Sequence, residues 1–174
     1  DAYPQIYADV WGEMLARKLG LPAFDEAHDA PLAAELFRVL ALAETDMTVF
    51  FRRLADVTSA TADPVVALSD AYYAPDDVSS DARDALRGWT DTYLGRLGAL
   101  GVDDHARRQR MYAVNPVYVL RNYPAQVAID RAEGGDDEGV RALLEVLRRP
   151  YEDQPGRESY AEKRPEWARH RPGC

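Results

Sequence analysis

The spacing of its apolar residues is the feature that most constrains how this chain can fold. Between residues 6 and 19 they recur at intervals of one, three and four positions, which is the pattern of one broad helix face. The members of this face are Ile6, Tyr7, Val10, Trp11, Met14, Leu15 and Leu19. Strand signals are weak, because no stretch alternates cleanly between polar and β-branched apolar residues. The sequence therefore predicts an all-α fold.

Residues that start or end helices separate these apolar patterns. Gly20 follows the first helix as a C-terminal cap glycine would. Further helices are predicted to begin at Asp29 (with Pro31 in the first turn), Asp46, Asp63, Ser80, Asp103 or Asp104, Asn115 and about Asp136. We expect a compact multi-helix domain of about seven or eight helices over residues 1–150. After Pro150 the spacing stops, so residues 151–174 are predicted to form an extended C-terminal tail.

Composition excludes several functions and suggests a setting. The 174 residues carry a formal net charge of −9, which argues against binding to nucleic acid or to anionic membranes. No run reaches the roughly 18 apolar residues of a membrane span. Lysine is supplied only by Lys18 and Lys163, and this preference for arginine is typical of GC-rich bacterial genes. We therefore expect a bacterial, cytoplasmic protein.

A search for catalytic groups finds no convincing site. There is no glycine-rich phosphate loop, and His28, His105 and His170 lack the spacing of metal ligands. Adjacent acids such as Asp103 and Asp104 precede helices, where carboxylates accept backbone N–H bonds. The cluster of Arg107, Arg108 and Arg110 is interpreted as a solvated helix face, and the aromatic residues as core. The residues thus predict no catalytic, metal or cofactor site in this chain.

The stretch from 107 to 167 is more specific than its composition. "RMYAVNPVYVLRNYPAQVAID" is followed by "EVLRRPY" and then by "RPEW". This order resembles the C-terminal end of the selenoprotein O family, the kinase-like protein adenylyltransferases, whose pattern includes N-P-x-Y-V-L-R-N-[YW]-x-A-Q. The signature residues carried over are Asn115, Pro116, Tyr118, Arg121, Asn122, Gln126, Arg148 and Trp167. The earlier segments "LARKLGL" and "TDMTVFFRRLADV" also fit the family, so the resemblance covers essentially the whole chain.

The resemblance implies that this chain is roughly the last third of a longer enzyme. Such an enzyme transfers AMP from ATP to Ser, Thr or Tyr hydroxyls of proteins. Its ATP and Mg²⁺ sites would lie in kinase-like lobes upstream of this region, which then acts as a structural or regulatory element. The first residue, Asp1, is not Met, which fits this expectation. The alternative is a free-standing helical interaction module without catalytic activity.

The resemblance and the residues together lead to four local expectations. Asn115 and Pro116 are predicted to start a helix as N-cap and first-turn proline, and Pro124 to kink it. Arg121 and Asn122 are expected to be structural, binding carbonyls or carboxylates of neighbouring elements. Cys174, the only cysteine, is a candidate for the family's redox residue. A region that belongs to a larger fold should also expose apolar surface, so the isolated chain is expected to self-associate or to be marginally stable.

Overall fold

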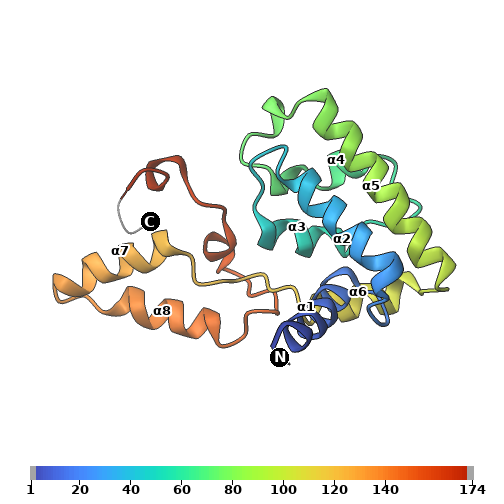
Figure 1. Ribbon diagram of the computed structural model, residues 1–174. Helices are drawn as coiled ribbons and strands as arrows, with labels where there is room; N and C mark the ends of the chain where they lie inside the picture. Colours follow the sequence, from blue (N-terminus) through green and yellow to red (C-terminus); the bar gives the residue numbers. More distant parts are fainter. Residues whose placement is uncertain (1–2, 172–174) are drawn as a thin grey trace. The chain divides into compact units, whose positions relative to one another are not determined.

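The computed structural model describes residues 3–171, and within them the fold is all-α, as predicted (Figure 1). Eight α-helices and four short 3₁₀ helices account for the regular structure of this range. The only pairing of extended backbone described is a single bridge between Thr45 and Tyr72. The chain divides into two compact units, Asp1–Asn115 and Pro116–Cys174. Each unit is described by itself.

The first unit contains six of the α-helices. They are α1 (Tyr3–Leu19), α2 (Glu26–Leu40), α3 (Met47–Leu54), α4 (Pro64–Ala67), α5 (Ser80–Ala99) and α6 (Asp104–Tyr112). Two 3₁₀ helices, η1 (Ser69–Ala71) and η2 (Pro75–Asp77), connect α4 to α5. The long helices α2 and α5 pack against each other, and α1 contacts α2, α3 and α6 (Figure 1).

Side-chain caps explain why most of these helices begin where they do. Asp46, Asp63 and Asp103 each accept a hydrogen bond from a backbone N–H of the first turn, as the sequence predicts. The start of α2 was predicted wrongly. Its N-cap is Asp25, and Asp29 lies inside the helix. Asp29 is fully buried, and its carboxylate accepts hydrogen bonds from the Asp25 N–H and from Arg96 of α5.

The core of the first unit is built from aromatic and aliphatic side chains of α1 to α6. Trp89 and Tyr93 of α5 stack with ring centroids 5.1 Å apart, and Phe50 of α3 lies 6.3 Å from Trp89. The indole N–H of Trp89 donates to the Leu32 carbonyl oxygen at 3.0 Å, so its polar atom is satisfied inside the core. The interpretation of the aromatic residues as core is confirmed for Phe50, Phe51, Trp89 and Tyr93. It is wrong for Tyr7, which is exposed, and Trp11 is half-buried.

Helix α1 departs from its predicted packing. Gly20 ends it with φ 71°, as expected of a cap glycine, and Leu15 and Leu19 are buried. However, Ile6, Tyr7, Val10 and Met14, which were predicted to face inward, are all exposed. The apolar spacing predicts the helix correctly but not which of its apolar residues this unit buries.

The second unit contains a helical hairpin and the C-terminal segment. Helix α7 (Asn122–Glu133) and helix α8 (Glu138–Leu147) lie side by side, joined by a turn in which Gly135 has φ 91° (Figure 1). Gly139 of α8 stands close to α7, since a Cβ at this position would lie 3.3 Å from the Cβ of Ala128. The glycine therefore allows the two helices to approach closely.

The segment after α8 is irregular and contains two short 3₁₀ helices, η3 (Glu158–Ala161) and η4 (Glu166–Ala168). Gln154 holds the first part of this segment at the end of α8. The side-chain amide of Gln154 donates to the carbonyl oxygens of Val146 at 3.0 Å and Arg149 at 2.9 Å. The predicted division of the chain into a domain over residues 1–150 and a tail over residues 151–174 stays a prediction. In the structure, the described part of this segment belongs to the same unit as the hairpin.

Candidate functional site

Among the described residues, Arg107 has the largest fully buried side chain. Its side chain has no exposed surface, and it lies on α6. It donates to the carbonyl oxygens of Leu54 and Val57 at 3.4 and 2.6 Å and to the Tyr93 hydroxyl at 3.1 Å. The prediction that Arg107 belongs to a solvated face was wrong. Besides Asp104 and Met111 on its own helix, it binds the three acceptors above, which lie 14 to 53 residues away and are brought to it only by the fold.

Tyr93 extends this network to the end of α1. Its hydroxyl donates to the Leu19 carbonyl oxygen at 2.7 Å and accepts from Arg107. Burial raises the pKa of Tyr93 to about 12, although the nearby Arg107 charge acts in the opposite direction. Desolvation of the phenolate dominates, so the tyrosine remains a neutral donor throughout the physiological pH range.

Asn115 is fully buried and connects the ends of two helices. Its side-chain amide donates to the Lys18 carbonyl oxygen of α1 at 2.9 Å, and its backbone N–H donates to Met111 of α6 at 2.8 Å. Arg52 of α3 donates to the Asn115 carbonyl oxygen at 3.2 Å. These bonds satisfy carbonyl groups that the helix ends leave without partners.

The predicted helix start at Asn115 and Pro116 was therefore wrong. Helix α6 ends at Tyr112, and Asn115 lies just beyond it, where its N–H binds the Met111 carbonyl oxygen. Pro116 disfavours the helical conformation of Asn115. The next helix begins at Asn122, after an extended Arg121 whose side chain makes no capping bond. The expected kink at Pro124 is also absent from the described structure. Pro124 lies in the first turn of α7, where its missing N–H needs no partner.

Tyr118 fastens the stretch before α7 to the segment after α8. It is buried, and its hydroxyl accepts a hydrogen bond from the Gln154 N–H at 3.1 Å. The backbone N–H groups of Val117 and Tyr118 both donate to the Pro150 carbonyl oxygen, at 2.8 and 3.1 Å. Tyr118 and Pro150, two residues of the recognised pattern, therefore meet in the structure and hold the base of the hairpin.

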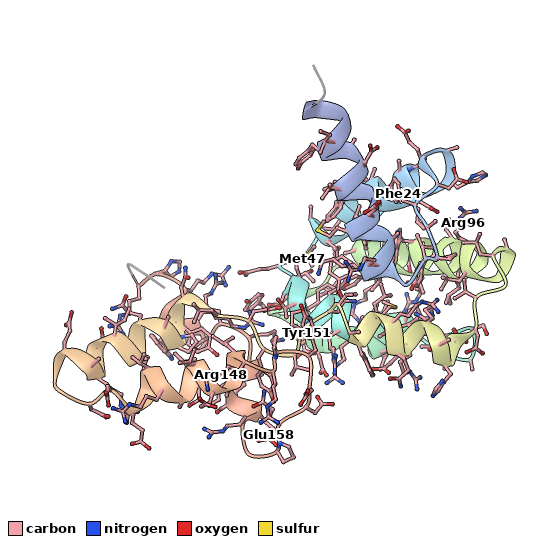
Figure 2. The ribbon with its side chains drawn as sticks, turned by 90° about the horizontal axis from the view of Figure 1, so that it is seen from below. Phe24, Met47, Arg96, Arg148, Tyr151 and Glu158 are labelled. Carbon is pink, nitrogen blue, oxygen red and sulfur yellow. The ribbon has the colours of Figure 1, made fainter. Side chains whose placement is uncertain are left out.

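The remaining signature residues lie at the surface of the second unit. Asn122 is exposed, and Gln126 donates to Asp130 of the same helix at 2.8 Å. Arg148 directly follows α8 (Figure 2). Its guanidinium pairs with Glu145 at 2.7 Å. Arg121 is half-buried. Its expected anchoring role stays a prediction.

Trp167 lies in η4 and contacts α7. Its ring packs edge-on against Tyr123, with centroids 6.2 Å apart and planes at 90°. Arg171 lies over the Trp167 ring at 5.8 Å and pairs with Asp130 of α7. These contacts hold the C-terminal segment on the hairpin. Cys174, the candidate redox residue, lies outside the described residues.

Metal-ligand clusters and paired titratable groups are the places where the described side chains could do chemistry. Within residues 3–171, no three His, Cys, Asp or Glu residues are arranged so that they could hold a metal ion. In the same range, no helix combines the length and the apolar character needed to cross a membrane. His28 pairs with Asp25 at 2.8 Å, and this hydrogen bond lowers the pKa of the Asp25 carboxyl. Because Asp25 is also the cap of α2, the pair is explained by the helix start.

The first unit has a cavity of about 770 Å³ between α1 and the loop that leads to α2. Its lining includes Trp11, Leu21, Phe24 and the charged Glu13 and Arg17. A second cavity, of about 500 Å³, lies between the ends of α1 and α6 beside Arg17 and Arg110. Neither cavity contains a signature residue.

Comparison with known proteins supplies what the geometry alone does not. The family model described as protein adenylyltransferase SelO matches residues 1–148. The chain belongs to the SelO family. This confirms the resemblance recognised in the sequence, and the match includes seven of the eight signature residues and excludes Trp167.

The curated relatives of this SelO-family chain are longer. A protein nucleotidyltransferase YdiU of Rhodopirellula baltica is 50% identical over 99% of this chain and 34% of its own length. The protein of the same name from Tolumonas auensis is 47% identical over 100% of this chain and 33% of its own length. That of Xanthomonas axonopodis pv. citri is 48% identical over 91% of this chain. The chain thus spans about a third of the length of the relatives it matches.

Proposed function

We propose that this chain is the C-terminal helical region of a SelO-family protein adenylyltransferase, and that it acts as a structural support for the catalytic part. The observation that carries the proposal is the match of the whole chain to one third of enzymes named protein nucleotidyltransferase. The full-length protein would transfer AMP from ATP to a Ser, Thr or Tyr hydroxyl of a protein substrate. It would do so in the bacterial cytoplasm.

In this reaction the hydroxyl oxygen bonds to the α-phosphorus of ATP, and pyrophosphate leaves as the hydroxyl proton is lost. Phosphoryl and nucleotidyl transfer depend on metal ions and cationic groups that hold the phosphates. Among the described residues, no three His, Cys, Asp or Glu side chains form a metal-binding group. On the strength of the family resemblance, we assign ATP and Mg²⁺ to kinase-like lobes outside this chain.

The role of the chain would instead be mechanical. Arg107 and Asn115 each join segments that are far apart in the sequence, and both are fully buried. Tyr118 does the same in the second unit. Such satisfied buried polar groups define one arrangement of the helices, because any other arrangement would leave them without partners. A support with one fixed arrangement can hold a neighbouring lobe in its active geometry.

The proposal is tested by comparing the chain with the full-length protein. In calorimetry with ATP and Mg²⁺, the full-length protein is expected to bind, whereas residues 1–174 alone give no signal at micromolar concentrations. Radiolabel from α-labelled ATP should move to protein only with the full-length enzyme. Micromolar ATP binding by residues 1–174 would contradict the placement of the nucleotide site. A gene that encodes only these residues after its own start codon would favour the free-standing interaction module.

A further inference from the structure

Helix α1 carries two apolar faces, one mainly along its C-terminal turns and one mainly along its N-terminal turns. One contains Leu15 and Leu19, which are buried in the first unit. The other consists of four exposed residues, which we call the α1 stripe: Ile6, Tyr7, Val10 and Met14. With 3.6 residues per turn, these four positions fall within an arc of about 100° on the helix surface. The stripe is therefore continuous, and it lies apart from the face that packs on the core.

Nothing in the first unit covers the α1 stripe among the described residues. Trp11, on the other face, contacts Phe24 and Phe37 through its ring, at centroid distances of 6.2 and 6.3 Å. The N-terminal turns of α1 extend beyond the other helices of this unit (Figure 2). Single exposed apolar residues are normal on a protein surface, but four in one strip indicate an interface. A helix that is apolar on two faces is typically covered on both.

We propose that the α1 stripe docks against the part of the full-length protein that lies outside this chain. This inference rests on the proposed function, in which the chain is the last third of a longer enzyme. The relatives match this chain over only 33–34% of their length, so about two thirds of such a protein is available to cover the stripe. Because that part is joined covalently to α1, it meets the stripe at a high effective concentration.

The chemical character of the α1 stripe indicates what kind of surface can dock against it. The four side chains carry no charge, whereas Asp9, Glu13 and Arg17 are exposed charged residues near them on α1. An apolar centre with a charged rim is the usual anatomy of a protein interface. The docking surface is thus an apolar groove or helix face with polar groups at its edge. A second copy of the chain is the competing occupant.

Val10 and Val66 provide a matched pair for the test. Both are exposed valines of the first unit, at 61% and 69%, but Val66 lies on α4 and outside the stripe. Hydrogen exchange of residues 6–14 is measured in the full-length protein with Val10→Asp or Val66→Asp. Val10→Asp should speed exchange by about tenfold or more, since a docked valine is replaced by a charge. Val66→Asp should leave it unchanged.

A photo-crosslinking amino acid at position 10 then identifies what covers the stripe. The expected product is an intramolecular crosslink to a peptide outside residues 1–174, with no such product from position 66. Equal exchange in the two aspartate variants, a crosslink between two copies, or no crosslink at all would overturn the proposal. The readouts do not use AMP transfer. Docking can therefore fail while the enzyme is active, and an inactive enzyme can still show docking.

Discussion

The two units of this chain are stabilised in different ways. In the first unit, a continuous hydrophobic core runs from α1 to α6, and the buried Arg107 and Asn115 lie within it or at its edge. In the second unit, the described buried side chains are few: Tyr118, Ala128, Leu143, Val146 and Ala168. Its other contacts include hydrogen bonds, exposed ion pairs and partly exposed ring packing around the hairpin.

This difference shows where cooperative stability resides. Burial of apolar area is the dominant favourable term in folding, so the first unit should unfold as one cooperative block. Regions with few buried apolar contacts open locally at lower free energy. The second unit should therefore exchange its amide hydrogens faster than the first. Variants in each unit can test this difference in stability.

Arg107→Ala should give the largest effect. It removes a fully buried side chain and leaves the carbonyl oxygens of Leu54 and Val57 without this donor. We expect the free energy of unfolding of the first unit to fall by about 3–5 kcal/mol. Hydrogen exchange of α5 and α6 measures this loss, while exchange in α7 and α8 should not change.

The neighbouring arginine serves as the control for this variant. Arg108 lies on the same helix, but its side chain is 39% exposed and pairs with Asp56 at the surface. Arg108→Ala should cost less than about 1 kcal/mol. Equal losses for the two variants would show that burial of the guanidinium does not decide the stability of the first unit.

Ionisation of Tyr93 should have a smaller effect on the free energy of unfolding, and this effect should appear only at high pH. Folding raises its pKa from 10.0 to about 12, so between these values the unfolded chain has lost the proton while the folded chain keeps it. This contribution to stability is fully present below pH 10 and is lost as the pH rises through 12. It amounts to roughly 3 kcal/mol below pH 10, and most of it is lost by pH 12. Urea denaturation from pH 9 to 12, followed by hydrogen exchange in the first unit, measures it.

Tyr93→Phe should remove this alkaline component. At neutral pH the variant should also lose about 1 kcal/mol, because the Leu19 carbonyl oxygen loses its bond from the hydroxyl. Tyr7→Phe, at an exposed position of the same unit, is the control. If stability falls between pH 10 and 12 as steeply in Tyr93→Phe as in the unchanged protein, another group causes the fall.

Local signals explain what the sequence could predict. Helix spacing and the caps Asp46, Asp63 and Asp103 involve residues within one turn of each other, so their outcome does not depend on the rest of the fold. The all-α class and most helix positions follow from them. The family followed from an ordered set of motifs, which no single helix pattern provides.

The errors arose where distant partners decide the outcome. Asn-Pro is a valid start signal for a helix, but the Lys18 carbonyl oxygen, 97 residues away, binds the Asn115 side chain instead. In the sequence, Arg107 has the pattern of a surface residue of a polar helix. In the structure, Leu54, Val57 and Tyr93 accept its hydrogen bonds in the interior. On α1, the spacing could not separate the face that this unit buries from the α1 stripe. In each case the deciding group lies outside the window in which a pattern can be seen.

Tyr118→Phe should have the smallest effect on stability, and it tests the second unit. The variant loses the bond between the Gln154 N–H and the Tyr118 hydroxyl but keeps the ring in place. We expect a cost of about 1 kcal/mol, seen as faster exchange in α7, α8 and residues 150–157 and not in the first unit. Tyr151→Phe is the matched control, because Tyr151 belongs to the same unit and its ring is exposed. A loss that spreads to α5 and α6 would mean that the two units unfold together, and the contrast between a cooperative core and a locally opening hairpin would have to be abandoned.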